Sequence, residues 1–231
     1  MGIRLNKYVQ ENLNLSRRTF VSLVQSGKVF LNDELVESYS QEVKMGDLLE
    51  IRGKGIKTTI KDLNQSLDVI LFNKPVGFVC SKNDKHNKTI YKILPKEFQN
   101  YFYIGRLDKD SRGLLILTND SALVNKLQHP KYAVEKEYLV QIDKNLSLND
   151  YKKMKKGVLD QGDLLTIKTA KFFENKKGFF VKIILGEGKK RHIRRILNGL
   201  GYQILDLQRT TEGQFLLGNL KEGNWRRVNY S

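Results

Sequence analysis

The chain has 231 residues, of which 40% are hydrophobic and 29% charged, a composition that excludes a disordered protein and is sufficient for a core without disulfides. Lysine and arginine number 41 against 25 acidic residues, and the formal net charge of +16 favours nucleic acid over an acidic membrane surface as partner. The single cysteine, Cys80, excludes an internal disulfide, the three histidines form no zinc cluster, and neither a signal-peptide core nor a membrane-spanning run is present, so we expect a cytoplasmic protein without a metal.

Two helices and several short strands are predicted near the N-terminus. Apolar residues between positions 5 and 9 repeat at helical spacing. Ser16 can cap a second helix, which Gly27 would end. Residues 28–36 predict two short strands around a polar turn, and residues 48–52 predict a further strand.

Basic residues gather on and beside these two predicted helices, away from the apolar positions. Arg17 and Arg18 follow the cap of the second helix, where free backbone N–H groups also attract anions. Two interpretations remain open, a face that grips RNA phosphates and a basic face that is merely solvated. The candidate RNA-binding residues of this region are Arg4, Lys7, Arg17, Arg18 and Lys28.

The composition divides the chain into two predicted domains. Residues 53–66 have the composition of a linker, so we expect a first domain over 1–58, a linker over 59–66 and a second domain over 67–231. In the second domain, strands outnumber helices and do not alternate strictly with them, which predicts a mixed, mainly antiparallel α+β domain. The predicted strands cover 69–72, 101–104, 113–117, 138–142, 165–170 and 179–185, and helices are predicted near 120–127, 147–156 and 190–199.

A polar loop with two aspartates and two arginines lies between the predicted strands 101–104 and 113–117. Asp108 and Asp110 have the spacing of a calcium loop, but Arg112 occupies a ligand position and the flanking segments are strands, which disfavours calcium. Two interpretations remain. The residues form an Asp–Arg network that stabilises a turn, or the arginines keep a carboxylate ionised so that it acts as nucleophile or base.

A third segment, residues 186–201, combines glycines and basic residues with an apolar helical stripe. Arg191, Arg194 and Arg195 project from the other faces of this predicted helix. Positive charge beside glycines near a helix start suits contact with RNA phosphates, although a surface helix with a solvated basic face has the same pattern.

Together these segments resemble the RsuA/RluB family of ribosomal RNA pseudouridine synthases over nearly the whole chain. Residues 3–52, with Arg-Leu-Asn-Lys-Tyr, Leu-Ser-Arg-Arg and Gly-Lys-Val-Phe-Leu-Asn-Asp, resemble the small RNA-binding domain named after ribosomal protein S-four. The most specific block is Gly-Arg-Leu-Asp at 105–108, followed by Gly-Leu-Leu-Ile-Leu-Thr-Asn-Asp. Other matching blocks are Asn-Lys-Pro-Val-Gly at 73–77, His-Pro at 129–130, Lys-Glu-Tyr at 136–138, Glu-Gly at 187–188, Arg-His-Ile-Arg-Arg at 191–195 and the end of the chain from 217 to 226.

The resemblance implies an enzyme that isomerises a uridine of ribosomal RNA to pseudouridine. It implies that Asp108 is the catalytic nucleophile, that Tyr138 stacks on the target base and that Arg194 pairs with the aspartate. It also implies a sheet with a central cleft and an N-terminal RNA-binding module on a flexible linker. No atom is gained or lost in this reaction, so no cofactor is expected. The further residues expected to contact RNA are Arg106 and Arg112, which could instead brace the loop, and Arg191 and Arg195.

Some positions depart from the family pattern, and other functions remain possible. Ser111, Ser121, Lys190 and His192 stand where other residues are common in the family, which bears on the identity of the substrate. The alternative is a non-catalytic RNA-binding or ribosome-assembly factor on the same fold, against which the intact catalytic trio argues. A DNA-binding protein would require a helix-turn-helix with base-reading residues, which the sequence lacks. We expect a monomer with ribosomal RNA as its partner.

Overall fold

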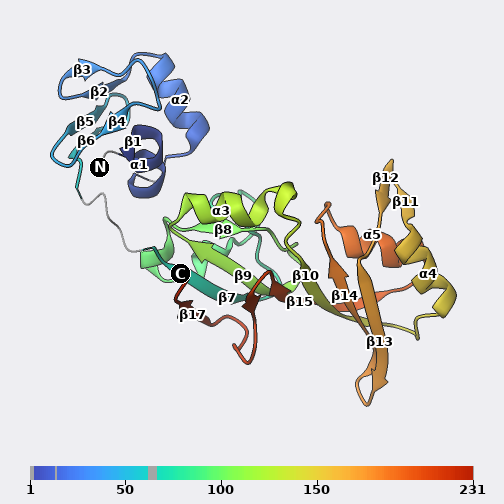
Figure 1. The fold of residues 1–231 in the computed structure, drawn as a ribbon. Helices are drawn as coiled ribbons and strands as arrows, with labels where there is room; N and C mark the ends of the chain where they lie inside the picture. The colour runs from blue at the N-terminus through green and yellow to red at the C-terminus, as the bar shows by residue number, and fades with distance from the viewer. Residues whose placement is uncertain (1–2, 14, 62–66, 231) are drawn as a thin grey trace. The chain divides into compact units, whose positions relative to one another are not determined.

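The computed structural model describes residues 3–13, 15–61 and 67–230 (Figure 1). The chain divides into two compact units, of which the second begins at Val69. Among the described residues, no helix has the length and apolar sequence needed to cross a membrane.

The first unit contains the two helices α1 (Leu5–Asn12) and α2 (Arg17–Gln25). The predicted cap of α2 is confirmed, because the side chain of Ser16 accepts a hydrogen bond from a backbone N–H of the first turn. The predicted end is also confirmed. Gly27 has a φ of +66°, and its N–H and that of Lys28 bond back to carbonyls of the last turn.

Short strands pack against these helices around a core that includes Leu5, Val9, Phe20 and Leu49. The predicted hairpin at 28–36 is confirmed and turns through two residues with positive φ. Four strands form an antiparallel sheet in the order β3-β2-β5-β6, and two more form a separate pair. Their bounds are β1 (Ile3–Arg4), β2 (Val29–Leu31), β3 (Glu34–Leu35), β4 (Glu42–Val43), β5 (Leu48–Ile51) and β6 (Ile56–Thr59).

The prediction that residues 53–66 form a linker is wrong for the first half of this segment. Strand β6 pairs with β5, and Ile60 is buried in the core of the first unit. Alternation of inward and outward side chains from Ile56 to Ile60 is enough to form a strand although most of these residues are polar. The first unit therefore extends through Ile60, and residues 62–66 of the predicted linker lie outside the described residues.

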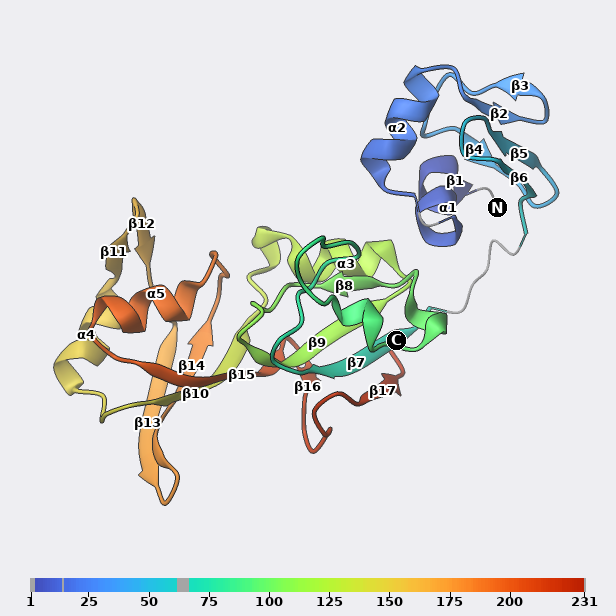
Figure 2. The same cartoon turned by 180° about the vertical axis from the view of Figure 1, so that it is seen from behind.

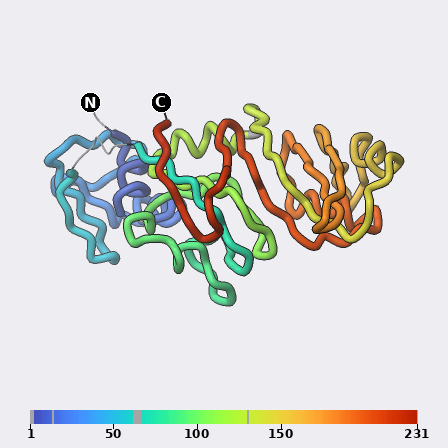
Figure 3. Tube along the Cα trace, turned by 90° about the horizontal axis from the view of Figure 1, so that it is seen from below, coloured from blue at the N-terminus to red at the C-terminus, as the bar shows by residue number. Residues whose placement is uncertain are grey.

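The second unit is built on a nine-stranded sheet in the order β13-β14-β10-β15-β9-β7-β17, with β16 beside β15 and β8 beside β9. Every pair is antiparallel except β9 with β15, so the predicted mixed, mainly antiparallel sheet is confirmed. Figure 3 shows the end of the chain running beside the start of the unit, where β17 pairs with β7. The bounds are β7 (Val69–Lys74), β8 (Phe102–Ile104), β9 (Arg112–Thr118), β10 (Lys136–Ile142), β13 (Thr169–Asn175), β14 (Gly178–Leu185), β15 (Ile204–Glu212), β16 (Phe215–Leu216) and β17 (Trp225–Val228).

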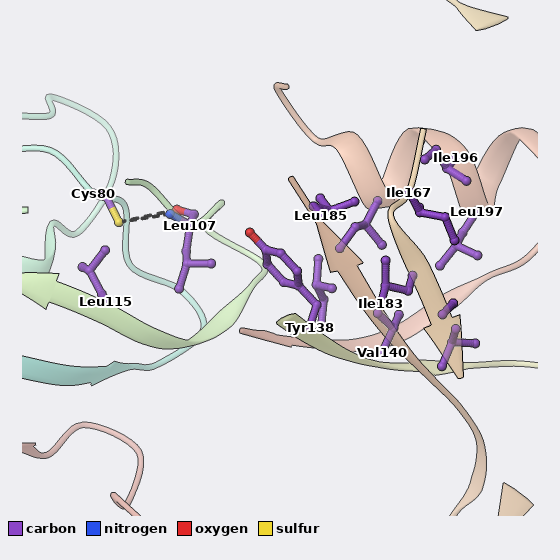
Figure 4. Close-up of a cluster of buried hydrophobic side chains, with 14 of the residues drawn as sticks. Cys80, Leu107, Leu115, Tyr138, Val140, Ile167, Ile183, Leu185, Ile196 and Leu197 are labelled. Atoms are coloured by element: carbon purple, nitrogen blue, oxygen red, sulfur yellow. Dashed lines mark hydrogen bonds between the residues drawn. The ribbon is translucent and has the colours of Figure 1, made fainter. Parts of the chain in front are cut away.

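Three helices pack on this sheet: α3 (Ser121–Gln128), α4 (Leu148–Lys156) and α5 (His192–Gly199). Figure 2 shows α4 and α5 close together near β14, and Figure 4 shows apolar side chains of α5 beside those of β14 and β10. Met154 of α4 and Ile196 of α5 share one buried cluster with Ile183 of β14. This packing fixes α5, which carries two candidate arginines and follows a third, Arg191, against the face of the sheet that holds Tyr138.

The predicted strand at 165–170 is interrupted, because only residue 165 and residues 169–170 lie in strands. The structure has a hairpin of β11 (Val158–Asp160) and β12 (Asp163–Leu165), a break, and then β13. In the break, the carbonyl of Thr166 contacts the ring of His192 and the N–H of Ile167 donates to Met154 of α4. Contacts to two helices that are distant in sequence therefore interrupt a segment whose local pattern is strand-like.

Candidate active site

The loop that carries Asp108 joins β8 to β9 and has a glycine at each end. Gly105 and Gly113 both have positive φ, at +64° and +109°. A Cβ atom on Gly113 would lie 2.3 Å from the backbone oxygen of Arg209, where β9 and β15 run parallel. Glycine is therefore required at this position by backbone conformation and by the close approach of the neighbouring strand.

Buried Lys74 fixes the backbone of this loop. Its side chain is fully buried at the end of β7, and its ammonium donates to the carbonyls of Pro75 (3.0 Å), Asp108 (3.1 Å) and Ser111 (2.7 Å). Burial lowers the pKa of Lys74. The three donors of the ammonium match three carbonyls, two of which belong to the loop, so the position of Asp108 depends on this lysine.

Replacing Lys74 by methionine is expected to lower the free energy of unfolding by about 3 kcal/mol, because three inward-facing carbonyls lose a charged donor. Urea denaturation followed by the fluorescence of Trp225 measures this change. The matched control is Lys109→Met, which makes the same substitution at an exposed loop position and should change stability by less than about 0.5 kcal/mol. Equal losses in the two variants would show that the Lys74 contacts contribute nothing specific.

Two arginines at the start of α5 bind the acidic side of the loop. The guanidinium of Arg191 donates to both carboxylate oxygens of Asp110, at 3.4 and 3.2 Å, and lies 3.9 Å from Asp108 Oδ2. Burial raises the pKa of Asp110, but the hydrogen bond from Arg191 and the charge of Arg194 outweigh it and hold the pKa below its usual value. The side chain of Asp108 is about one third exposed (35%), so it is open to a bound molecule.

The expected pair of Arg194 with Asp108 is not the one that the structure forms. Arg194 Nε lies 3.4 Å from Asp110 Oδ2, and Nη2 donates to the carbonyl of Asp110 (2.8 Å) and the hydroxyl of Ser111 (3.1 Å). Burial lowers the pKa of Arg194, and both aspartates oppose this effect. Arg194 thus holds the loop at Asp110 and Ser111, and Asp108 forms its ion pair with Arg191.

Tyr138 faces the loop from β10, which β15 separates from β9. It lies on β10, is nearly buried (9% exposed), and its hydroxyl points toward the segment of Leu107 in Figure 4. Arg209 lies opposite Tyr138 in the pairing of β10 with β15, and its positive charge acts to lower the pKa of this phenol. Burial raises the pKa of Tyr138, and the charge of Asp108 adds to the effect. The phenol is therefore neutral, and Asp108 and Tyr138 belong to one site.

The other predicted residues differ in their surroundings. Arg106 is exposed on the loop, whereas Arg112 forms two hydrogen bonds of 2.9 and 2.8 Å with Asp206. Arg195 is bound to both acids at the tip of the β11–β12 hairpin. Carboxylates therefore neutralise the charges of Arg112 and Arg195. This favours a role in bracing the site over a role in contacting RNA phosphates. In the first unit, Arg4, Arg17, Arg18 and Lys28 are exposed, and Lys7 lies half-buried beside Glu11.

Two buried cations of the site were not singled out from the sequence. Lys74 was noted only within a matching block, and Arg209 on β15 not at all. The available signal is a cation close after a run of apolar residues, as Lys74 follows residues 69–72 with Asn73 between them. This signal is weak, because the same pattern occurs wherever a strand ends at the surface.

Comparison with known proteins gives matches over both units. A family profile described as RNA pseudouridylate synthase matches residues 68–199, and one described as S4 domain matches residues 3–49. The chain is 36% identical to the dual-specificity RNA pseudouridine synthase RluF of Escherichia coli, over 97% of this chain and 75% of that protein. It is 33% identical to the ribosomal large subunit pseudouridine synthase B of Buchnera aphidicola subsp. Schizaphis graminum, over 99% and 91%. A crystal structure of a pseudouridylate synthase is similar with a TM-score of 0.66 and 28% identity, over 98% and 96% of the two chains.

Proposed function

We propose, from the premise that the chain belongs to the RNA pseudouridylate synthase family, that it isomerises one uridine of ribosomal RNA with Asp108 as its catalytic nucleophile. The observation that carries the proposal is the carboxylate of Asp108. It is one third exposed on a loop whose backbone Lys74 fixes from inside, and Arg191 lies 3.9 Å away. A partly exposed carboxylate on a rigid loop beside a cation is suited to nucleophilic attack.

The reaction breaks the bond between ribose C1′ and N1 of uracil and forms a bond between C1′ and C5. The proton on C5 leaves to solvent and N1 gains one, so atoms and electrons balance without a further reactant. The carboxylate of Asp108 attacks C1′ or the base. A bond to C1′ breaks when C5 joins the sugar, and a bond to the base breaks by elimination of the carboxylate after C5 has joined. A base inside a helix cannot reach Asp108, so the target uridine leaves its stack.

The remaining residues receive roles from their contacts. Tyr138 supports the extruded base through its neutral ring, and Arg191 places a positive charge 3.9 Å from the carboxylate of Asp108. Arg194 holds the loop through Asp110 and Ser111. Arg106 contacts phosphate, while Arg112 and Arg195 brace the site.

The same proposal covers the organisation of the chain. Residues 1–58 and the two that follow them act as an RNA-binding domain, and residues 67–231 form the catalytic domain with the target base in a cleft beside Asp108. The RNA backbone is bound by five basic residues of the first domain, four of which are exposed. They are Arg4, Lys7, Arg17, Arg18 and Lys28. The enzyme works as a monomer in the cytoplasm, where RNA supplies the interface.

Deleting the gene is expected to remove one pseudouridine from ribosomal RNA. Carbodiimide labelling marks pseudouridine, and reverse transcription stops at each labelled base. One stop should vanish in the deletion strain and return with the wild-type gene. An unchanged map would refute ribosomal RNA as the substrate and direct the same experiment to transfer RNA.

A further inference from the structure

Three charged side chains lie behind Tyr138, in the interior of the second unit. Arg209 is 1% exposed and Glu212 is fully buried, and the side chain of Lys136 is 17% exposed. Burying charge in a protein costs free energy even when the charges are paired. The roles assigned above do not use this cluster, so its presence beside the site requires a separate explanation.

A β-bulge brings the cluster to one face of the sheet. In the pairing of β10 with β15, Lys136 lies opposite Glu212 and Tyr138 lies opposite Arg209. The register shifts between these pairs, so two residues of β10 span three residues of β15. In a regular strand, side chains three residues apart point to opposite faces. The bulge therefore turns both Arg209 and Glu212 toward the face that carries Tyr138.

The guanidinium of Arg209 is held on several sides. Its Nη2 lies 3.1 Å from Glu212 Oε2, and its Nε donates to the carbonyl of Leu114 at 2.7 Å. Tyr138 lies directly opposite Arg209 on β10, and the charge of Arg209 opposes the rise in the pKa of its phenol. Lys136 Nζ lies 3.8 Å from the other carboxylate oxygen of Glu212, which fixes the orientation of that acid.

The same pair supports the start of the loop that carries Asp108. A Cβ atom on Gly105 would lie 3.1 Å from Arg209 Nη1 and 3.2 Å from Glu212 Oε1. The loop therefore packs directly on the ion pair. Arg209 thus lies opposite the tyrosine of the site across the strand pair and beside the base of the catalytic loop, although it is too buried to touch RNA itself.

We propose that Arg209 is a positioning residue that fixes the hydroxyl and ring of Tyr138, and that Glu212 holds the Arg209 guanidinium in place. This inference rests on the proposed function of Tyr138 in pseudouridine formation. A guanidinium offers several donors in one rigid plane, so it orients a phenol beside it as a flexible ammonium does not. The orientation of Tyr138 then sets the plane in which the target base stacks.

The test removes the ion pair without leaving a lone charge. Replacing both partners in Arg209→Met/Glu212→Leu should leave a folded protein, since paired apolar residues often replace buried ion pairs without loss of stability. The rate constant for tritium release from C5 of labelled ribosomal RNA transcript, at saturating enzyme, is expected to fall about 10- to 100-fold. The Kd for the same transcript should change by less than about twofold, since Arg209 does not reach RNA.

A second readout observes Tyr138 directly. With 3-fluorotyrosine placed at position 138, the double variant should shift the ¹⁹F resonance, because the phenol loses the positive charge opposite it. Arg209→Lys keeps a charge beside Glu212 but lacks the planar fork, and it should also slow tritium release. The matched control is Arg227→Met/Glu97→Leu, which removes an exposed ion pair of the same unit and should change neither readout.

The outcomes separate this inference from the proposed function. No tritium release by the wild type would refute the proposed function, and the ¹⁹F shift would still decide whether Arg209 orients Tyr138. An active wild type with an equally active double variant would overturn the positioning role. If the double variant does not fold, Arg209→Lys decides alone, and a wild-type rate for it would overturn the proposal.

Discussion

Asp108→Asn is expected to abolish pseudouridine formation and to leave RNA affinity within about threefold of wild type. Asparagine has the shape of aspartate but no negative charge, so the loop and its contacts to Lys74 remain while the nucleophile is lost. Removal of a catalytic nucleophile costs on the order of 10⁴-fold or more in rate. Tritium release from C5 under single-turnover conditions measures the rate, and filter binding of the same RNA measures affinity.

Asp110→Asn is the matched control, because it makes the same change two residues along the loop. Asp110 bonds to Arg191 and Arg194 but is assigned no part in the chemistry. We expect this variant to lose about tenfold in rate through looser positioning of the loop. If Asp108→Asn lost binding and melting temperature together with activity, the aspartates and arginines would be a structural network, the alternative that the sequence left open.

Local features of the chain were predictable where one segment determines them. The cap at Ser16, the end of α2 at Gly27 and the hairpin at 28–36 follow from side-chain chemistry and backbone preference within a few residues. The loop around Asp108 was located by its unusual pair of aspartates and arginines between two strands. The resemblance then supplied roles that residue patterns alone had left undecided.

Features that depend on distant partners were not predictable. β6 forms because β5 offers an edge, and the segment at 165–170 breaks because α4 and α5 bind its backbone. The bulge in β15 disturbs the alternation from which a strand is inferred, so the strand of Arg209 was missed. The partner of Arg194 could not be predicted either, because Asp108 and Asp110 lie two residues apart on the same loop and only the fold selects between them.

Removing residues 1–61 is expected to weaken RNA binding about 10- to 100-fold and to change the single-turnover rate at saturating RNA by less than about threefold. The second unit has its own apolar cores, so it should fold without the first. Residues 1–61 contain ten basic and seven acidic residues, a net charge of +3 out of +16. The loss of RNA affinity therefore depends on where the basic residues of the first unit lie and much less on its net charge.

Salt dependence tests that placement. If the first unit contacts about four phosphates, its removal should reduce the slope of log K against log salt by about three. In the full chain, Arg17→Gln/Arg18→Gln should reduce the slope by between about one and two, because both side chains are exposed at the start of α2. Lys44→Gln/Lys54→Gln removes the same charge from exposed positions of the same unit outside the two helices, and should leave the slope unchanged. Equal effects of the two pairs of substitutions on the slope would mean that the first unit attracts RNA only through diffuse charge. An unaltered RNA affinity after removal of residues 1–61 would show that the first unit takes no part in RNA binding.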